Sequence, residues 1–292
     1  MLRAMRRLLP FMLLFACVAG FAHAQQPTIT LTPAQVLAGA PELVRIDTHG
    51  ATAVTGEWLG RKLQFIRGLR GTWFALCGVD VEQPEGSSTL TLHLTTHHGR
   101  ATDLVRTIPI AAAPYRTSSL AVAPEYVEPG PEAQSRIAAD QKTKDAVFAT
   151  SAPHALWRGS FRPPVASPQT ESFGTRRIFN GTLASIHRGL DFRARVGTPV
   201  RASNSGVVAF AGPLYYEGNC VILDHGLGLF TVSMHLSRIN VRPGQHVAKG
   251  QRLGLSGATG RATGPHLHWS VRWQGASLDP AKLLKLNLNQ VH

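Results

Sequence analysis

The sequence contains few cysteines, few acidic residues and no apolar run long enough to cross a bilayer comfortably. Three cysteines in 292 residues exclude a small fold held together by disulfides. The 17 Asp and Glu residues stand against 30 Lys and Arg, which leaves a formal net charge of +13. A hydrophobic content of 43% excludes a largely disordered chain. At about 150 residues per domain, the length favours two domains.

The excess positive charge lies in one part of the chain. Residues 25–113 hold 7 basic and 7 acidic residues, and residues 114–160 hold 5 of each. Residues 161–292 hold 15 basic and 5 acidic residues. Such a charge favours nucleic acid, an acidic membrane surface or an anionic polymer as partner. No RNP, KH or helix-turn-helix pattern is present, so we expect no nucleic-acid partner.

The first 24 residues are typical of a secretory signal peptide. Three arginines precede the apolar stretch Leu8–Gly20, and Ala22-His23-Ala24 forms a cleavage motif. We therefore expect a periplasmic or secreted protein that has no transmembrane helix after signal cleavage. Cys17 follows Phe15 in a poor match to a lipoprotein box, so lipidation at Cys17 is not expected.

The remaining chain predicts a mainly β protein. Residues 25–113 read as a β-sandwich-like domain, because short strand candidates alternate with Gly, Pro and Ser clusters. Residues 114–160 read as a proline-rich linker with a helix over residues 132–150, and residues 161–286 as a second β-rich domain followed by a tail, 287–292. The strand candidates are residues 28–31, 43–46, 62–66, 73–79, 89–95, 102–110, 198–202, 206–211, 220–224, 229–234, 252–255 and 268–273.

Tryptophan and cysteine carry expectations about packing. Trp58 and Trp73 are predicted core residues of the first domain, since large aromatics dominate small sandwich cores. Cys77 and Cys220 fall in different predicted domains, so two separate buried thiols are expected rather than a disulfide.

Histidine spacing in the second β-rich domain points to a metal. Two patterns occur, His187-x-x-x-Asp191 and His266-x-His268. Two imidazoles and one carboxylate, with one position open, describe a catalytic zinc site. On a strand, residues 266 and 268 point to the same face. An H-x-H pair alone arises by chance roughly 0.6 times in a chain of this composition, so it carries little weight by itself.

A wider set of motifs resembles the lysostaphin/LytM-type zinc metallopeptidases. The motifs follow the order of that family across almost the whole stretch from Phe173 to Pro280, which makes the match far more specific than any single pattern. They are Phe173-Gly174, His187-Arg-Gly-Leu-Asp191, Gly197-Thr198-Pro199-Val200, Ser233-Met-His235-Leu-Ser, Gly260-Arg-Ala-Thr-Gly-Pro-His-Leu-His268 and Leu278-Asp279-Pro280. The preceding β domain and helix resemble, more weakly, the amino-terminal part of some secreted Gram-negative members.

The resemblance implies a role for each site residue. His187, Asp191 and His268 correspond to the ligands of one zinc ion per chain, and His235 and His266 correspond to the catalytic histidines. Which of these two acts as base and which stabilises the oxyanion stays open. The resemblance also implies an antiparallel β-sheet metallopeptidase domain with the zinc on the floor of a groove.

Two positions depart from the family pattern. Ser233 stands where a tyrosine is usual, and Ser270 where glutamate is frequent. Neither is an implied metal ligand. Asn219, Arg176 and Asn180 are candidate substrate contacts, although loop residues of these types equally form turns.

The leading functional prediction is a secreted zinc endopeptidase that cleaves peptide cross-links of peptidoglycan through metal-activated water. One alternative is a non-catalytic wall-binding or amidase-activating module of the same fold. Another is a secreted protease that acts on a protein substrate. The role of residues 25–113 and the oligomeric state stay open.

Overall fold

The computed structural model describes residues 26–48, 50–97, 99–120, 129–179 and 182–291. The expected signal peptide, Cys17 and Asn180 lie outside these residues. None of the helices in the described ranges is both long and apolar enough to span a membrane.

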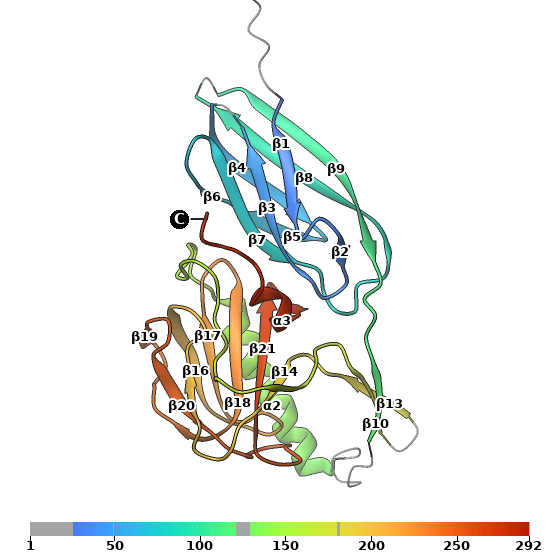
Figure 1. The fold of residues 1–292 in the computed structure, drawn as a ribbon, viewed down its shortest axis with the longest axis vertical. Coiled ribbons are helices and arrows are strands. Elements are labelled where there is room, and N and C mark those ends of the chain that lie inside the picture. The colour runs from blue at the N-terminus through green and yellow to red at the C-terminus, as the bar shows by residue number, and fades with distance from the viewer. Residues whose placement is uncertain (1–25, 49, 98, 121–128, 180–181, 292) are drawn as a thin grey trace, which may run out of the picture.

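The amino-terminal part consists of two sheets packed face to face (Figure 1). Trp58 and Trp73 are both buried between the sheets, as expected. Burial alternates along Thr89–Leu94, with Leu90, Leu92 and Leu94 turned inward, as the sequence alternation predicts. One sheet has the order β1 (Thr28–Thr32), β3 (Pro41–Asp47), β7 (Thr72–Gly78) and β6 (Ile66–Arg67), and the other β2 (Val36–Leu37), β9 (Ala101–Ala111), β8 (Gly86–Thr96), β4 (Ala51–Trp58) and β5 (Arg61–Gln64).

Strand β4 was not predicted from the sequence. Its residues include two alanines and Gly56, which have low strand propensity. Pairing with β8 and β5 holds the strand in place. A Cβ atom at Gly56 would lie 2.7 Å from the carbonyl oxygen of Thr91, so the close approach of the two strands needs glycine there. Tertiary contacts therefore override a weak local preference.

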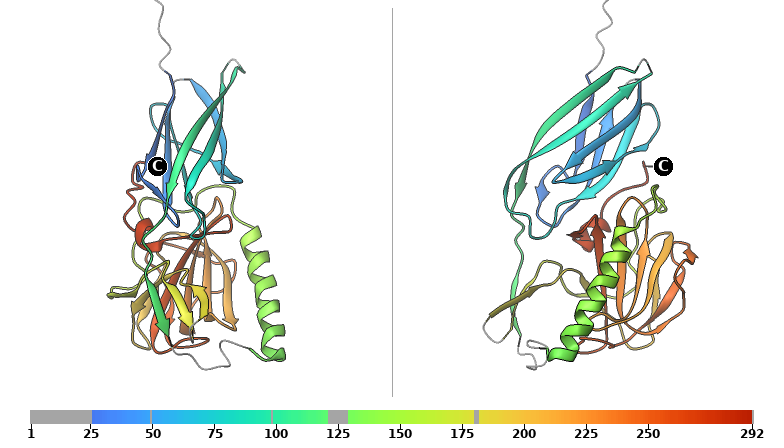
Figure 2. Two further views of the ribbon diagram at one scale, coloured as in Figure 1. Left: turned by 90° about the vertical axis from the view of Figure 1, so that its right-hand side faces the viewer. Right: turned by 180° about the vertical axis from the view of Figure 1, so that it is seen from behind.

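The linker contributes structure to the second half of the protein. β10 (Thr117–Leu120) pairs in parallel with β12 (Arg176–Phe179), which pairs with β13 (Thr182–Ile186). The predicted helix is present as α2 (Pro131–Ala149), and it lies beside one face of the carboxy-terminal sheet (Figure 2). None of its residues is buried. A few specific contacts therefore hold α2, rather than a continuous apolar stripe.

A ten-stranded sheet forms the carboxy-terminal part. Along its central strand, Leu267, Trp269, Val271 and Trp273 turn to the core, while the alternate residues face the opposite side. The main path runs β11 (Gln169–Glu171), β14 (Leu190–Arg193), β21 (His266–Trp273), β18 (Leu229–Ile239), β17 (Gly218–Asp224), β16 (Gly206–Leu214) and β19 (His246–Val247), with β15 (Pro199–Arg201), β20 (Arg252–Ser256) and β22 (Ala276–Leu278) paired off this path and α3 (Pro280–Leu283) after it.

The two β-rich parts meet in a packed junction. The backbone N–H of Asp279 donates to the Gly39 carbonyl at 2.7 Å, and that of Ser277 donates to Asp80 Oδ2 at 2.7 Å. The fully buried Leu278 packs on Gly78, where a Cβ atom would lie 2.5 Å from it. Beyond α3, Leu288 and Val291 are buried too, so most of the expected tail belongs to the packed structure.

We expect Leu278→Ala to lower the free energy of unfolding by about 2–5 kcal/mol, because the junction would keep a cavity that its rigid surroundings cannot fill. Urea unfolding followed by circular dichroism measures this change. Leu69→Ala is the matched control, since Leu69 is 82% exposed and its truncation should cost less than about 0.5 kcal/mol. Equal effects of the two substitutions would contradict this account of the junction.

Both cysteines of the described chain are free thiols. Cys77 and Cys220 are each fully buried, in the sandwich and in the carboxy-terminal sheet respectively. Burial raises the pKa of each thiol well above its usual value. The expectation of two separate buried thiols is confirmed.

Candidate metal centre

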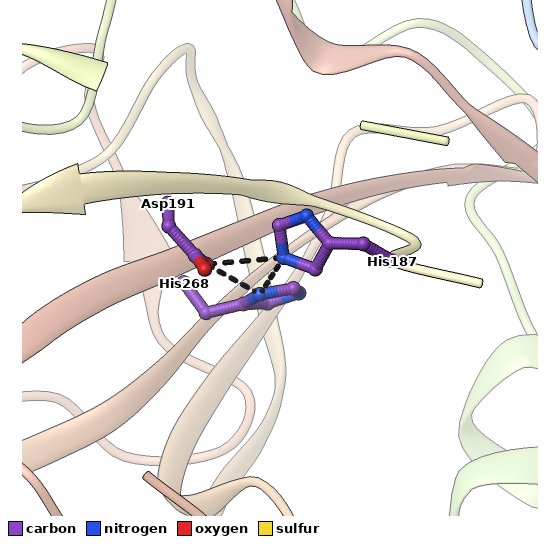
Figure 3. A group of neighbouring side chains, drawn as sticks. All are labelled: His187, Asp191 and His268. Carbon is purple, nitrogen blue, oxygen red and sulfur yellow. Dashed lines mark hydrogen bonds and ion pairs between the residues drawn. The ribbon is translucent and has the colours of Figure 1, made fainter. Parts of the chain in front are cut away.

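Three side chains from three separate segments of the chain meet at one point. His187 follows β13, Asp191 lies on β14 and His268 lies on β21. Asp191 and His268 are direct partners across the β14–β21 pair, so both point to the same face of the sheet. Figure 3 shows the three side chains converging.

The three facing atoms form a small triangle. His187 Nε2 lies 3.0 Å from His268 Nδ1 and 3.2 Å from Asp191 Oδ1. The third edge, from His268 Nδ1 to Asp191 Oδ1, is 2.8 Å (Figure 3). Ligand atoms around a tetrahedral zinc with bonds of about 2.0–2.2 Å are roughly 3.3–3.6 Å apart. The triangle is therefore close to the size that such an ion requires.

The hydrogen-bonding state of the three facing atoms also favours a bound cation. His187 Nδ1–H donates to the Ser172 carbonyl at 2.9 Å, so Nε2 of the neutral ring carries a lone pair. The ionised carboxylate of Asp191 is an acceptor only. His187 Nε2 and Asp191 Oδ1 are therefore both acceptors, and of the three facing atoms only His268 Nδ1 can carry a proton. A metal ion between these three atoms would accept a lone pair from each of them, so the residues fit a metal.

The second carboxylate oxygen of Asp191 faces an arginine. Arg177 Nη2 lies 3.6 Å from Asp191 Oδ2 and is itself held in a short ion pair by Glu171. Burial alone would raise the pKa of Asp191, but the adjacent imidazoles of His187 and His268 hold that pKa below its usual range. The carboxylate is therefore ionised and fixed in orientation.

Glycine at position 189 is a steric requirement of the site. A Cβ atom there would lie 2.2 Å from His268 Nε2 and 3.0 Å from the Trp269 carbonyl oxygen. The chain between His187 and Asp191 thus passes directly beside the ring of His268. Only a residue without a side chain lets the three groups come together.

Two further histidines stand beside the triangle. The ring centroids of His235 and His266 are 4.7 Å apart, and His235 is 6.1 Å from the ring of His268. His235 Nδ1–H donates to the Thr259 carbonyl at 2.9 Å, and His266 Nδ1–H donates to the Gly264 carbonyl at 2.8 Å. Both neutral rings therefore carry their lone pair on Nε2. His266 Nε2 lies 3.9 Å from Asp191 Oδ1.

His235 reaches this side of the sheet through an irregular backbone. Val232 and Met234 face the groove, so simple alternation along β18 would turn His235 away from it. The φ angle of His235 is +59°, in the left-handed region, and the pairing of β18 with β20 shifts just after it. This conformation costs about 1–2 kcal/mol and brings the ring back among the other histidines.

Burial also sets the charge of His235. Desolvation lowers its pKa to about 4, and the nearby His268 lowers it further in the same direction. His235 is 6% exposed. At neutral pH the ring is uncharged and can accept a proton at Nε2.

His187, His235 and His268 line a groove of about 330 Å³. Val232 and Met234 of β18 form part of its floor, and Lys144 and Phe148 of α2 form one wall. The ring of Phe148 packs edge-on against Phe230 of the sheet, with centroids 5.2 Å apart. The helix that precedes the sheet in the sequence therefore shapes the groove.

The other candidate contacts lie elsewhere. Asn219 Nδ2 donates to the Leu236 carbonyl and its backbone N–H bonds to Thr259 Oγ1, so Asn219 braces the loop behind His235. Arg176 is exposed, whereas its neighbour Arg177 lines the groove. Neither the position of Arg177 nor the role of Gly189 was predicted from the sequence. Arg176 was expected instead of its neighbour, and the pairing of β12 places Arg177 rather than Arg176 at the groove.

Comparison with known proteins identifies the domain. Residues 185–280 match the sequence profile of Peptidase family M23, and this range includes all five His and Asp positions of the site. The carboxy-terminal domain is an M23 peptidase domain. The M23 resemblance predicted from motif order is thereby confirmed, as is the mainly β architecture with a helix in the linker.

Similar proteins share this M23 domain. Peptidoglycan DD-endopeptidase ShyA of Vibrio cholerae is 42% identical over 136 residues, 46% of this chain and 31% of ShyA. DD-carboxypeptidase/endopeptidase Mpg of Neisseria meningitidis is 42% identical over 98 residues, 34% of this chain and 23% of Mpg. The chain thus spans less than a third of either relative.

One crystal structure resembles both halves of the protein. An M23 peptidase from Pseudomonas aeruginosa, 26% identical, superposes with a TM-score of 0.67 and covers 86% of this chain and 95% of its own. The arrangement of a β-sandwich ahead of an M23 domain therefore occurs in another protein.

Proposed function

We propose that the protein is a zinc-dependent endopeptidase that hydrolyses peptide cross-links of bacterial peptidoglycan. The observation that carries the proposal is the triangle of His187 Nε2, Asp191 Oδ1 and His268 Nδ1 beside two histidines with free Nε2 atoms, in an M23 domain. Relatives that share the domain are named peptidoglycan DD-endopeptidases, which supports this substrate.

In this proposal, His187, Asp191 and His268 hold one zinc ion. Imidazole nitrogen and carboxylate oxygen are donors that zinc prefers, and three protein ligands leave a position open for water or substrate. A bound zinc would polarise the scissile carbonyl and lower the pKa of its bound water. Arg177 keeps Asp191 oriented through its second oxygen.

His235 and His266 serve the proton transfers. Each ring is anchored through Nδ1–H to a backbone carbonyl, so its Nε2 is aimed into the site. One Nε2 accepts a proton from the attacking water and passes it to the leaving amine. The other ring can donate a hydrogen bond to the developing oxyanion after its Nε2 takes up a proton from solvent, and it returns that proton when the oxyanion collapses. No covalent intermediate with the protein is needed.

The proposed location is the periplasm or the exterior of the cell. Residues 1–24 carry the basic start, apolar stretch and cleavage motif of a signal peptide. Peptidoglycan lies outside the cytoplasmic membrane, so the proposed substrate and the proposed location agree.

Zymography on purified sacculi tests the function. We expect lysis by the zinc-loaded protein, its loss after treatment with a chelator, and its return when zinc is added back. Lysis that persists without metal would contradict the proposal. A zinc-loaded protein that binds sacculi without lysing them would instead be a non-catalytic wall-binding or amidase-activating module. Digestion of casein but not of sacculi would indicate a protease with a protein substrate.

Gly189→Ala is expected to weaken zinc binding about 10- to 100-fold although all three ligands remain, because the new methyl group displaces the His268 ring. Competition against a fluorescent zinc chelator measures the affinity. Gly264→Ala is the control, since a Cβ atom there meets nothing within 4 Å and its carbonyl still accepts from His266. Unchanged affinity in Gly189→Ala would contradict the steric argument.

A further inference from the structure

The groove is lined by five cationic side chains, and three of them are already neutralised within the protein. Lys144 Nζ lies 2.6 Å from Glu217 Oε1, Arg177 pairs with Glu171, and Arg188 pairs with Glu82 of the sandwich. The remaining two are Arg261 and Arg272, and no carboxylate of the described residues lies within 4.0 Å of either.

Arg272 is held at one end of the groove with part of its hydrogen-bonding capacity unused. Its guanidinium lies over the ring of Phe148, 4.6 Å from the centroid, and Nη2 donates to the Gly275 carbonyl at 3.2 Å. Nε is shielded from solvent and has no partner among the described residues. Burial lowers the pKa of the group, as does the like charge of Arg188. An arginine nevertheless stays charged in proteins.

Arg261 is held in the same way on another aromatic ring. Its guanidinium lies 4.1 Å from the centroid of Tyr216, and its backbone N–H donates to the Tyr216 carbonyl at 3.0 Å. Stacking on a ring leaves the edge of the guanidinium, with its N–H groups, free to bind a carboxylate. Both arginines are therefore oriented in advance but lack an anion.

The sheet register places the two arginines on opposite sides of the metal centre. His268 pairs with Met234, and Arg272 pairs with Phe230, four residues further along β21. That separation is about 13 Å at the usual rise of a strand. Arg261 belongs to the loop that precedes His266, beside the turn that connects β16 and β17. The triangle thus lies between them along the groove.

We propose that Arg261 and Arg272 each bind a free carboxylate of the substrate, one on either side of the scissile amide. The inference rests on the proposed endopeptidase function and narrows its substrate to peptides with free carboxylates in both joined chains. A guanidinium that is half buried and unpaired costs free energy in the free protein, and a bidentate carboxylate offsets that cost. Ser270 lies beside Arg272 on the same face of β21 and also lines the groove. Because serine carries no charge, it does not compete with a substrate carboxylate for Arg272.

The test uses one purified cross-linked muropeptide dimer and two derivatives in which the free carboxylates of one stem or the other are converted to carboxamides. We expect each amidation to lower kcat/KM of the full-length protein about 10- to 100-fold, the usual size of a charge-assisted hydrogen bond. Arg272→Gln should cancel this discrimination for one stem, and Arg261→Gln should cancel it for the other. Arg272→Lys should recover part of it.

Arg252→Gln is the control, because Arg252 is exposed on β20 outside the groove and its replacement removes the same charge. It should keep both discriminations. Calorimetric binding of the three dimers to chelator-treated protein gives a second measurement without turnover, and amidation should weaken binding there as well.

Equal cleavage of the free and amidated dimers by the unmodified protein would overturn the inference while leaving the endopeptidase function in place. Discrimination that survives in both glutamine variants would overturn it too. If no dimer is cleaved, the endopeptidase function fails, and equal binding of all three dimers would then overturn the carboxylate sites separately.

Discussion

Replacing His187, Asp191 or His268 with alanine is expected to abolish zinc binding and peptidoglycan hydrolysis together. Each residue supplies one corner of a triangle with edges of 2.8–3.2 Å, and two remaining corners cannot hold the ion against water and chelators. Loss of the several kcal/mol that a Lewis acid contributes lowers the rate on the order of 10³-fold or more. Atomic absorption for zinc and release of muropeptides from sacculi measure the two effects.

His246→Ala is the matched control for the histidine variants, because His246 is exposed on β19, away from the groove. It should keep both zinc and activity. Asp145→Ala serves the same purpose for the carboxylate, since Asp145 is exposed on α2, is no part of the triangle and accepts a hydrogen bond from Gln141. Full activity in Asp191→Ala would refute the proposed ligand set.

Replacing His235 or His266 with alanine should separate catalysis from metal binding. Neither residue belongs to the triangle, so zinc content should stay at one ion per chain. The rate of hydrolysis should fall about 10²- to 10⁴-fold, the usual contribution of a positioned proton donor or acceptor. The double variant should lose less than the product of the single losses if both rings act in the same proton transfers.

Thermal unfolding of the zinc-loaded variants controls for misfolding. His235→Ala also removes the hydrogen bond to the Thr259 carbonyl, so a small loss of stability is expected there. Loss of zinc in either variant would show that the ring is a ligand rather than a proton carrier, and unchanged turnover would exclude it from catalysis.

The proposed ligands could be named from the sequence because part of their spacing is local. His266 and His268 share a face of one strand through simple alternation, and the structure places β21 over this range. His187 and Asp191 lie close together because only three residues separate them in the chain. The long-range step, that Asp191 pairs with His268, could only be inferred from the resemblance to a family.

Two features of the site were not predicted, the left-handed backbone of His235 and the contact of Arg177 with Asp191. His235 carries a left-handed backbone at a bulge, and nothing in the pattern of β18 marks where alternation stops. Arg177 contacts Asp191 from β12, which pairs with β13 and with the distant β10, and the β12–β13 register shifts between Arg177 and Ile178. In both cases, backbone geometry rather than residue type brings the side chain to the site.

Some strands follow from the residue pattern, and others form only through pairing with neighbouring strands. Most of the longer strands could be predicted from the sequence, since alternating β-branched and apolar residues bury one face. It did not predict β4, β10 or β14, where short or glycine-containing segments are held by their neighbours. Local propensity is a weak preference in such segments, and pairing decides their conformation.

The sequence alone locates the excess positive charge, but only the folded structure shows which cations are paired. Counting alone places the excess of positive charge in residues 161–292, and motif order alone identifies the M23 domain. Which cations are neutralised depends on the fold, because Glu82 of the sandwich and Glu217 of a distant turn reach Arg188 and Lys144 across long sequence separations. Ion pairing depends on distances of a few ångströms between atoms, and those distances exist only once the sheets, α2 and the junction are assembled.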